Sequence, residues 1–421
     1  MRQLTNSAKM AGLTLTLALT LALAGLSAGS LLAGDPGKAV IDDKAPVEAS
    51  PWTVCNVFHH STLYESEKGF IREVSLNGRY HGQAISQSEN DGGVTNGFNQ
   101  WQHRRFRLGM DIAFAGNVTL KTSANISNGG GAGRGLTRGP FFDDWDEFYI
   151  DWEPSDDFYI QVGKQKQKIT REFSTSSKKI LTIERSHITN EVSDKKPWGV
   201  TVGFKIGGIK HEVGAWVTGA YNNGFGGTQN IGTPNYPNFN SRGALSYRLE
   251  APVTDNIDLH FDYLYVNNSS GTVNGRGNAA NGFDAPYEHT IALGSESEFG
   301  QFGLITDLIF AANREAHAGS AIPAGNDTWG AVILPYYNIT DKLQVVGRYA
   351  YMDEGRNQRT QRFNVRQGVQ SYHTFYAGIN YYICDHNLKL MAGYEYATGQ
   401  NNVTGAGITS DTWMFGIRTY F

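Results

Sequence analysis

The chain has 421 residues, a formal net charge of −4, 50 glycines, 21 tyrosines and only 18% charged residues. This composition excludes an architecture of long charged helices, which needs more Glu, Lys, Ala and Leu. Abundant Tyr, Gly, Asn and Thr fit short strands that are joined by turns and polar loops. The length allows one large domain or two ordinary ones.

The N-terminus predicts export. Arg2 and Lys9 precede a long apolar stretch of mostly small residues, and small-residue cleavage motifs stand at 22–24 and 28–30. This pattern is typical of a secretory signal peptide, which we place at 1–30. No later stretch reaches the ~18 consecutive apolar residues of a membrane helix.

Residues 31–69 contain three prolines and mixed charge. We expect a periplasmic arm or linker with little structure of its own. The adjacent histidines His59 and His60 lie in it, and without further ligands they predict no metal site.

From 70 to 421 a unit repeats: an alternating segment, a tight turn, a second alternating segment and a long Gly/Asn-rich loop. Tight turns are predicted at 115–117, 154–157, 207–208, 253–256, 299–301, 338–341 and 384–387. Long loops are predicted at 83–102, 128–144, 166–196, 221–240, 268–286, 312–326, 353–369 and 398–407. Seven hairpins, with one strand near 70–82 and another at 408–421, give sixteen strands.

Within the strands, apolar and polar residues alternate. In 105–114, Phe106, Leu108 and Met110 share one face and Arg105 and Arg107 the other. A soluble sandwich would show the same period. Segments of ~10 residues, alternating short and long connections, and aromatic residues near strand ends favour a membrane barrel. We therefore predict an all-β fold, a 16-stranded antiparallel transmembrane β-barrel with short periplasmic turns, long external loops and an aqueous lumen.

The stretch 164–196 is unusually basic, with nine Lys or Arg against four acids. It spans the predicted third loop, 166–196, which is the longest. If this loop narrows the lumen, its cations favour anions, and its hydroxyl groups can donate to an oxyanion. If it is merely a solvated loop, the charge has no such role. The candidate anion-pathway residues are Lys164, Lys166, Lys168, Arg171, Ser176, Ser177, Lys178, Lys179 and Arg185.

A second basic feature follows from closure of the barrel. Arg79 lies on the first strand, Arg105 and Arg107 on the second, and Arg418 on the last. Because the first and last strands of a closed barrel are neighbours, these four arginines form a predicted cationic strip on the lumen wall. Arg248 and Arg348 lie elsewhere. The alternative is that acids on the wall neutralise the strip. The candidates for that are Asp111, Asp258, Asp262 and Glu395.

The chain resembles the phosphate-selective porin O and P family over roughly 70–421. The resemblance rests on 104–109 (RRFRLG), 146–152 (DEFYIDW), 162–166 (VGKQK), 176–178 (SSK), 183–186 (IERS) and the terminal Phe421. It implies a trimeric outer-membrane porin with an inward third loop, a ladder of arginines and passive diffusion of phosphate or other small anions. The loop cations are mostly lysines, a departure that weakens the case for strong phosphate preference.

The two cysteines also suggest a link. Cys384 falls in a predicted periplasmic turn and Cys55 in the periplasmic arm. Export permits a disulfide, and the sequence leaves two alternatives open: a bond that ties the arm to the barrel, or two free thiols.

Enzyme motifs are missing from the sequence. It has no G-x-x-x-x-G-K-[ST], G-x-S-x-G, H-E-x-x-H or C-x-x-C, so we predict no enzyme, cofactor or metal, and no nucleic-acid partner. His260 beside Asp258 and Asp262 is the nearest approach to a catalytic group, and it lacks a nucleophile. The remaining alternatives are a porin for neutral or cationic solutes and a purely structural or adhesive barrel.

Overall fold

The computed structural model describes residues 53–59, 61–126, 144–193, 196–217, 243–266, 287–312, 327–353, 369–401 and 405–421. They belong to one compact unit, Thr53–Phe421. The predicted signal peptide and the arm up to residue 52 lie outside the described residues. No helix in the described part of the chain is long and apolar enough to cross a membrane.

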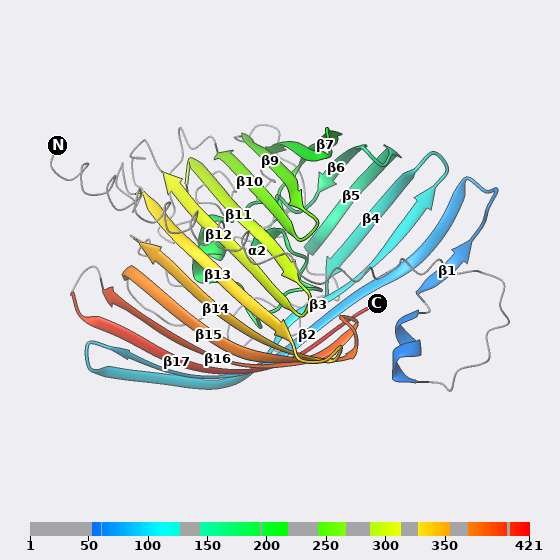
Figure 1. Cartoon of the computed structure of the whole chain (residues 1–421). Helices are drawn as coiled ribbons and strands as arrows, with labels where there is room; N and C mark the ends of the chain where they lie inside the picture. The colour runs from blue at the N-terminus through cyan, green and yellow to red at the C-terminus, as the bar shows by residue number, and fades with distance from the viewer. Residues whose placement is uncertain are drawn as a thin grey trace, which may run out of the picture. The chain divides into compact units, whose positions relative to one another are not determined.

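Sixteen antiparallel strands close into a barrel, as the sequence predicts (Figure 1). Each strand pairs with the next along the chain, and the last, β17, pairs with β2. Their bounds are β2 Ile71–Asp91, β3 Val94–Phe114, β4 Val118–Asn125, β5 Asp144–Ser155, β6 Phe158–Lys164, β7 Trp198–Ile206, β8 Ile209–Val217, β9 Gly243–Thr254, β10 Ile257–Val266, β11 His289–Phe299, β12 Phe302–Ala312, β13 Thr328–Asn338, β14 Leu343–Asp353, β15 Val369–Cys384, β16 Leu388–Asn401 and β17 Gly407–Tyr420.

All seven predicted tight turns join strands at one end of the barrel, here called the turn end. The opposite end is called the loop end. The turn between β7 and β8 shows the local cause: Gly207 and Gly208 have φ of 58° and 82°. Two consecutive positive φ values suit the two-residue hairpin turn that matches strand twist, and glycine adopts them without strain.

The predicted long loop 83–102 is wrong. β2 and β3 are each 21 residues long and meet in a tight turn at Gly92 and Gly93. The residues taken for a loop are rich in Gln, Ser and Asn. Beyond the apolar belt a strand needs no apolar face, so period-2 apolar alternation ends there although the ladder continues.

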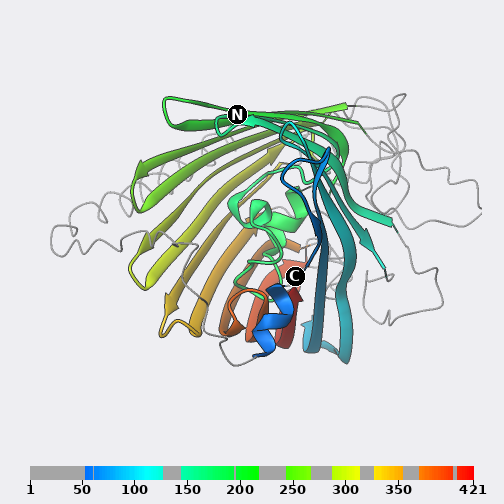
Figure 2. The same cartoon turned by 90° about the vertical axis from the view of Figure 1, so that its right-hand side faces the viewer.

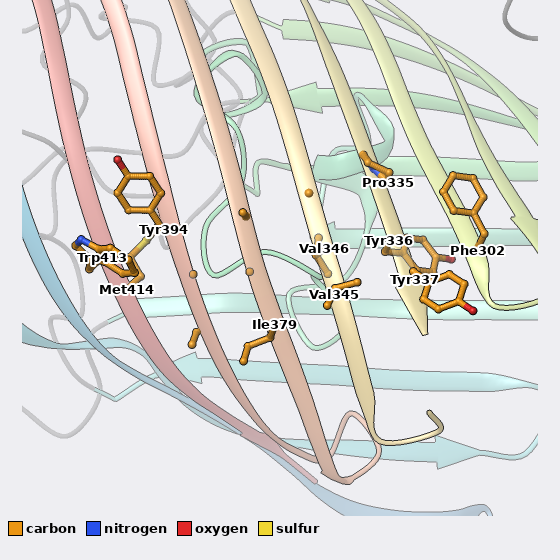
Figure 3. Close-up of a pocket in the computed structure, with 15 residues that line it drawn as sticks. Phe302, Pro335, Tyr336, Tyr337, Val345, Val346, Ile379, Tyr394, Trp413 and Met414 are labelled. Carbon is orange, nitrogen blue, oxygen red and sulfur yellow. The ribbon is translucent and has the colours of Figure 1, made fainter. Parts of the chain in front are cut away.

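The wall separates apolar and polar side chains. On β10, Leu259 is 40% exposed, whereas the alternate residues His260 and Asp262 are buried inside. On β12 to β17 the outer face includes a pocket of about 650 Å³, lined by apolar side chains that include Val345, Ile379 and Trp413 (Figure 3). Its lining is almost wholly apolar, as expected of a lipid-facing surface.

The described part of the predicted arm has structure of its own, contrary to expectation. A 3₁₀ helix, η1 (Val54–His59), precedes a short strand, β1 (Thr62–Glu65). β1 pairs with β2 at Glu73–Ser75, next to the point where β17 ends. β1 therefore continues the wall beside β2, which gives its backbone groups partners. Cys55 of η1 and Cys384 form a disulfide, with the sulfurs 2.02 Å apart.

Candidate functional site

The segment between β6 and β7 runs through the interior of the barrel (Figure 2). It contains two short helices, α2 (Arg171–Ser174) and α3 (His187–Val192). Its side chains and backbone contact strands on several sides of the barrel, and Ile169, Ile183 and Ile188 are fully buried. We call residues 165–197 the inner loop.

The inner loop is fastened to β12 at the start of α2. Asp307 of β12 accepts hydrogen bonds from the backbone N–H groups of Arg171 (2.7 Å) and Glu172 (3.1 Å). His260 of β10 lies 2.9 Å from the same carboxylate. A carboxylate suits these donors, because the first N–H groups of a helix have no partner within it.

A second fastening centres on Arg348 of β14. Its guanidinium donates to the carboxylate of Glu172 (2.9 Å) and to the backbone oxygen of Glu184 (2.6 Å), which lie on two arms of the inner loop. It also donates to Glu395 of β16 (2.6 Å). One buried side chain thus joins both arms to the wall.

The predicted wall arginines fall into two rows across neighbouring strands. Strand register places Arg418, His81 and Arg105 side by side on β17, β2 and β3. Arg79 and Arg107 face each other one step nearer the turn end. In the first row, Arg418 and Arg105 are 1% and 8% exposed.

The inner loop covers this first row. Arg418 donates to the backbone oxygen of Ile183 in the loop, at 3.0 Å, and Arg105 contacts His81 at 3.2 Å. Arg418 therefore holds the loop against the wall, whereas Arg105 contacts another wall residue, and both offer little surface to a passing solute.

The second row is more accessible. Arg79 donates to the hydroxyl of Ser177, and within the described residues it forms no salt bridge. The ammonium group of Lys178 lies 4.7 Å from the centre of the Tyr420 ring. Burial, followed by the charge of Arg79, lowers the pKa of Lys178. Arg107 instead pairs with Asp146 at 2.8 Å.

The other predicted loop residues differ in role. Lys168 pairs with Glu212, and Arg171 pairs with Glu250 and Glu296. A further three cations donate to backbone carbonyl oxygens. These are Lys164, which donates to Trp145, Lys166, which donates to Ser174 and Thr175, and Arg185, which donates to Glu172 and Thr175. Ser176 and Lys179 are exposed.

Lys166 has no carboxylate within salt-bridge distance among the described residues. Its pKa is lowered by burial first and then by Arg185 and Lys196. Among the described residues, Arg79 and Lys178 also form no salt bridge, so cations without a carboxylate partner lie near β2 and the loop segment 176–179.

The proposed neutralising acids do not pair with the strip. Asp262 binds Arg248 at 3.0 Å, and Glu395 binds Arg348. Asp111 accepts from Asn77 at 3.0 Å. In the described ranges, none of the four candidate acids forms a salt bridge with a strip arginine. The two arginines set aside in the sequence, Arg248 and Arg348, take two of these acids.

One cation was missed by sequence reasoning. Arg104 forms a salt bridge of 2.6 Å with Glu184 of the inner loop, although strict alternation from Arg105 points it outward. The register shifts between His81 and Gly82, which leaves Arg104 as an extra residue on β3. Such a bulge lets two consecutive side chains face the same side. The break in alternation at His103–Arg105 was the only sequence signal.

The nearest approach to a catalytic group is enclosed. His260 is 3% exposed and lies 2.9 Å from Asp307 and 3.8 Å from Asp262. Across the described part of the chain, no cluster of three or more His, Cys, Asp or Glu has metal-binding geometry.

A family model described as phosphate-selective porin O and P matches residues 74–253. The predicted resemblance is confirmed over that part of the chain. No curated protein matches the sequence.

Two solved structures share the fold. The outer-membrane channel DcaP of Acinetobacter baumannii is 14% identical, with a TM-score of 0.53 over 85% of this chain and 99% of that one. OmpF of Salmonella typhi, in complex with daunomycin, is 12% identical, with a TM-score of 0.54 over 83% of this chain and 98% of that one. The family match together with this closed barrel supports an outer-membrane porin.

Proposed function

We propose that the protein is a porin for passive, anion-preferring diffusion of small solutes such as phosphate or other oxyanions. The observation that carries this proposal is the distribution of charge around the inner loop. Arg79 and Lys178 form no salt bridge within the described residues. By contrast, Arg248 pairs with Glu250 and Asp262, and Arg348 pairs with Glu395. Net positive charge beside a solute path favours anions.

Arg79, Lys178 and Lys179 are the proposed contacts for the solute, with the hydroxyl groups of Ser176 and Ser177 as further donors. Arg105 and Arg418 act on selectivity through their long-range field and through the position of the loop. Lys168 and Arg171 contribute less, because carboxylates already accept from them. Lysines attract an oxyanion as point charges, and Arg79 is the one proposed contact with a guanidinium fork, so we do not expect strong phosphate discrimination.

Several features of the assembly belong to the same proposal. We place the turn end in the periplasm and the loop end outside the cell, as in outer-membrane barrels. A signal peptide would direct export, and the Cys55–Cys384 disulfide would hold the arm in the oxidising periplasm. A homotrimer fits the family resemblance.

The test is channel recording of the purified protein with single charge reversals. Arg79→Glu and Lys178→Glu should each lower the anion-to-cation permeability ratio about fivefold or more, because a unit charge about 4 Å from an ion is worth about 1 kcal/mol even in water. Lys68→Glu makes the same charge change at an exposed site between β1 and β2, and it should leave the ratio unchanged.

Phosphate titration separates two forms of the proposal. Saturable block of chloride current by phosphate indicates an oxyanion site. Anion preference without block indicates a general anion porin. Unchanged selectivity in both Arg79→Glu and Lys178→Glu would refute the assigned pathway.

A further inference from the structure

Among the described residues, three Tyr–His pairs lie on the outer surface of the barrel toward the loop end, and a fourth, Tyr247–His211, lies nearer the turn end. In each pair the tyrosine hydroxyl lies 2.8 or 2.9 Å from Nδ1 of a histidine on the neighbouring strand. The three pairs toward the loop end are Tyr80–His103, Tyr263–His289 and Tyr349–His373. A second aromatic ring contacts each histidine, namely Trp101, Tyr265 and Tyr351.

These pairs differ in what surrounds the other imidazole nitrogen. The carboxylate of Glu288 lies 3.7 Å from Nε2 of His289. Beside His373, Asp353 is in register with Ser371 and accepts from the indole of Trp329. His103 alone among the three has no acid in its strand neighbourhood, and within the described residues its Nε2 has no partner.

The His103 site is built into the strands. The backbone at Gly82 lies beneath it, and a Cβ there would come within 2.5 Å of the Trp101 ring and 2.8 Å of the Tyr80 hydroxyl. Glycine is therefore required for these two rings to lie against the sheet. The bulge at Arg104 keeps His103 facing outward while Arg104 faces the inner loop.

The depth of the site on the barrel is set by its neighbours along β3. Toward the turn end, the outward side chains are apolar and include Leu108 and Met110, each 36% exposed. Toward the loop end, the exposed residues in the same phase are Asn99, Gly97 and Thr95. Trp101 and His103 thus lie where the apolar belt gives way to a polar surface, the level of lipid headgroups.

The hydrogen-bond donors at this depth of the barrel determine which ligand the site can bind. With the hydroxyl of Tyr80 donating to Nδ1 of His103, the ring proton is on Nε2, which becomes an outward donor. The indole N–H of Trp101, on a side chain that is 48% exposed, is a donor without acceptor capacity. Among the described residues, β4 pairs with β3 only from Arg107 onward, so no described strand lies beside Trp101 and His103 on that side.

We propose that Tyr80, Trp101 and His103 form a binding site for the phosphate group of a membrane lipid in the outer leaflet. The lipid chains would lie along the apolar belt below, and the phosphate would accept from Nε2–H of His103 and from Trp101. This inference rests on the outer-membrane location and not on anion preference. The two proposals therefore fail separately.

The test is native mass spectrometry of the detergent-solubilised full-length protein, titrated with bisphosphorylated lipid A and with the same lipid after removal of its phosphates. The native chain should bind the phosphorylated lipid at least about tenfold more tightly than the dephosphorylated one, because only the phosphorylated lipid offers a charged group as hydrogen-bond acceptor. His103→Phe should abolish most of this preference. Gly82→Ala should do the same by displacing Trp101 and Tyr80.

His289→Phe is the matched control, because Glu288 already faces that Nε2, and it should keep the full preference. Heat-modifiable gel migration checks that each barrel is folded, and an unchanged permeability ratio in His103→Phe separates this site from the pore. An unaltered preference in His103→Phe would overturn the proposal. So would equal competition by inorganic phosphate, which would indicate a site for soluble anions.

Discussion

Arg348 should control whether the inner loop stays in place. In Arg348→Met the guanidinium is lost, while Glu172 and Glu395, which are 5% and 7% exposed, remain buried without it. Breaking a buried ion pair by removing one partner costs about 3–5 kcal/mol. Because the barrel ladder is untouched, we expect this cost to fall on the loop and to raise the population of its detached state by roughly two to four orders of magnitude.

Two assays report this detachment. Trypsin should cleave after Lys178 or Lys179 much faster in Arg348→Met than in the native protein, and single-channel conductance should become larger and noisier. Lys205→Met is the matched control, because its partner Asp157 is largely exposed and such surface pairs contribute little. If Arg348→Met gave native cleavage rates and conductance, the assigned fastening would be incorrect.

Three further predictions follow from neighbouring features. Asp307→Leu should also loosen the inner loop, because two backbone N–H groups of α2 and His260 lose their acceptor, and the same trypsin assay should detect it. Since burial lowers the pKa of Lys178, raising the pH from neutrality toward the ordinary lysine value of about 10.4 should remove the charge of Lys178 before that of exposed lysines, and the anion-to-cation permeability ratio should fall. Constant selectivity over this range would contradict that assignment. Replacing Cys55 and Cys384 with serine should cost about 2–4 kcal/mol and expose 53–69 to proteases, whereas equal digestion of both forms would show that β1 pairing alone holds the arm.

The barrel could be predicted from sequence because the alternation within each strand shows which face is apolar, and the residues of each tight turn show where the turn lies. Period-2 alternation and turn residues are local, so sixteen strands and seven turns followed. The β2–β3 hairpin was missed because its outer half lies beyond the apolar belt and lacks that alternation. Arg104 was missed because a bulge shifts the period by one residue.

The partners of the loop cations could not be predicted from the sequence. Arg171 and Arg185 look alike in sequence, yet one binds carboxylates of β9 and β11 and the other binds carbonyl oxygens of the loop itself. Such choices depend on contacts between residues far apart in the chain. Arg348, which joins the loop to the wall across 176 positions, gave no local signal for the same reason.

The reversal potential of the unmodified protein across a KCl gradient in a planar bilayer tests the central claim most directly. The charge distribution around Arg79 and Lys178 predicts a reversal potential on the chloride side. A potential at zero or on the potassium side would contradict it, and the inner loop would then be a structural element of a general porin.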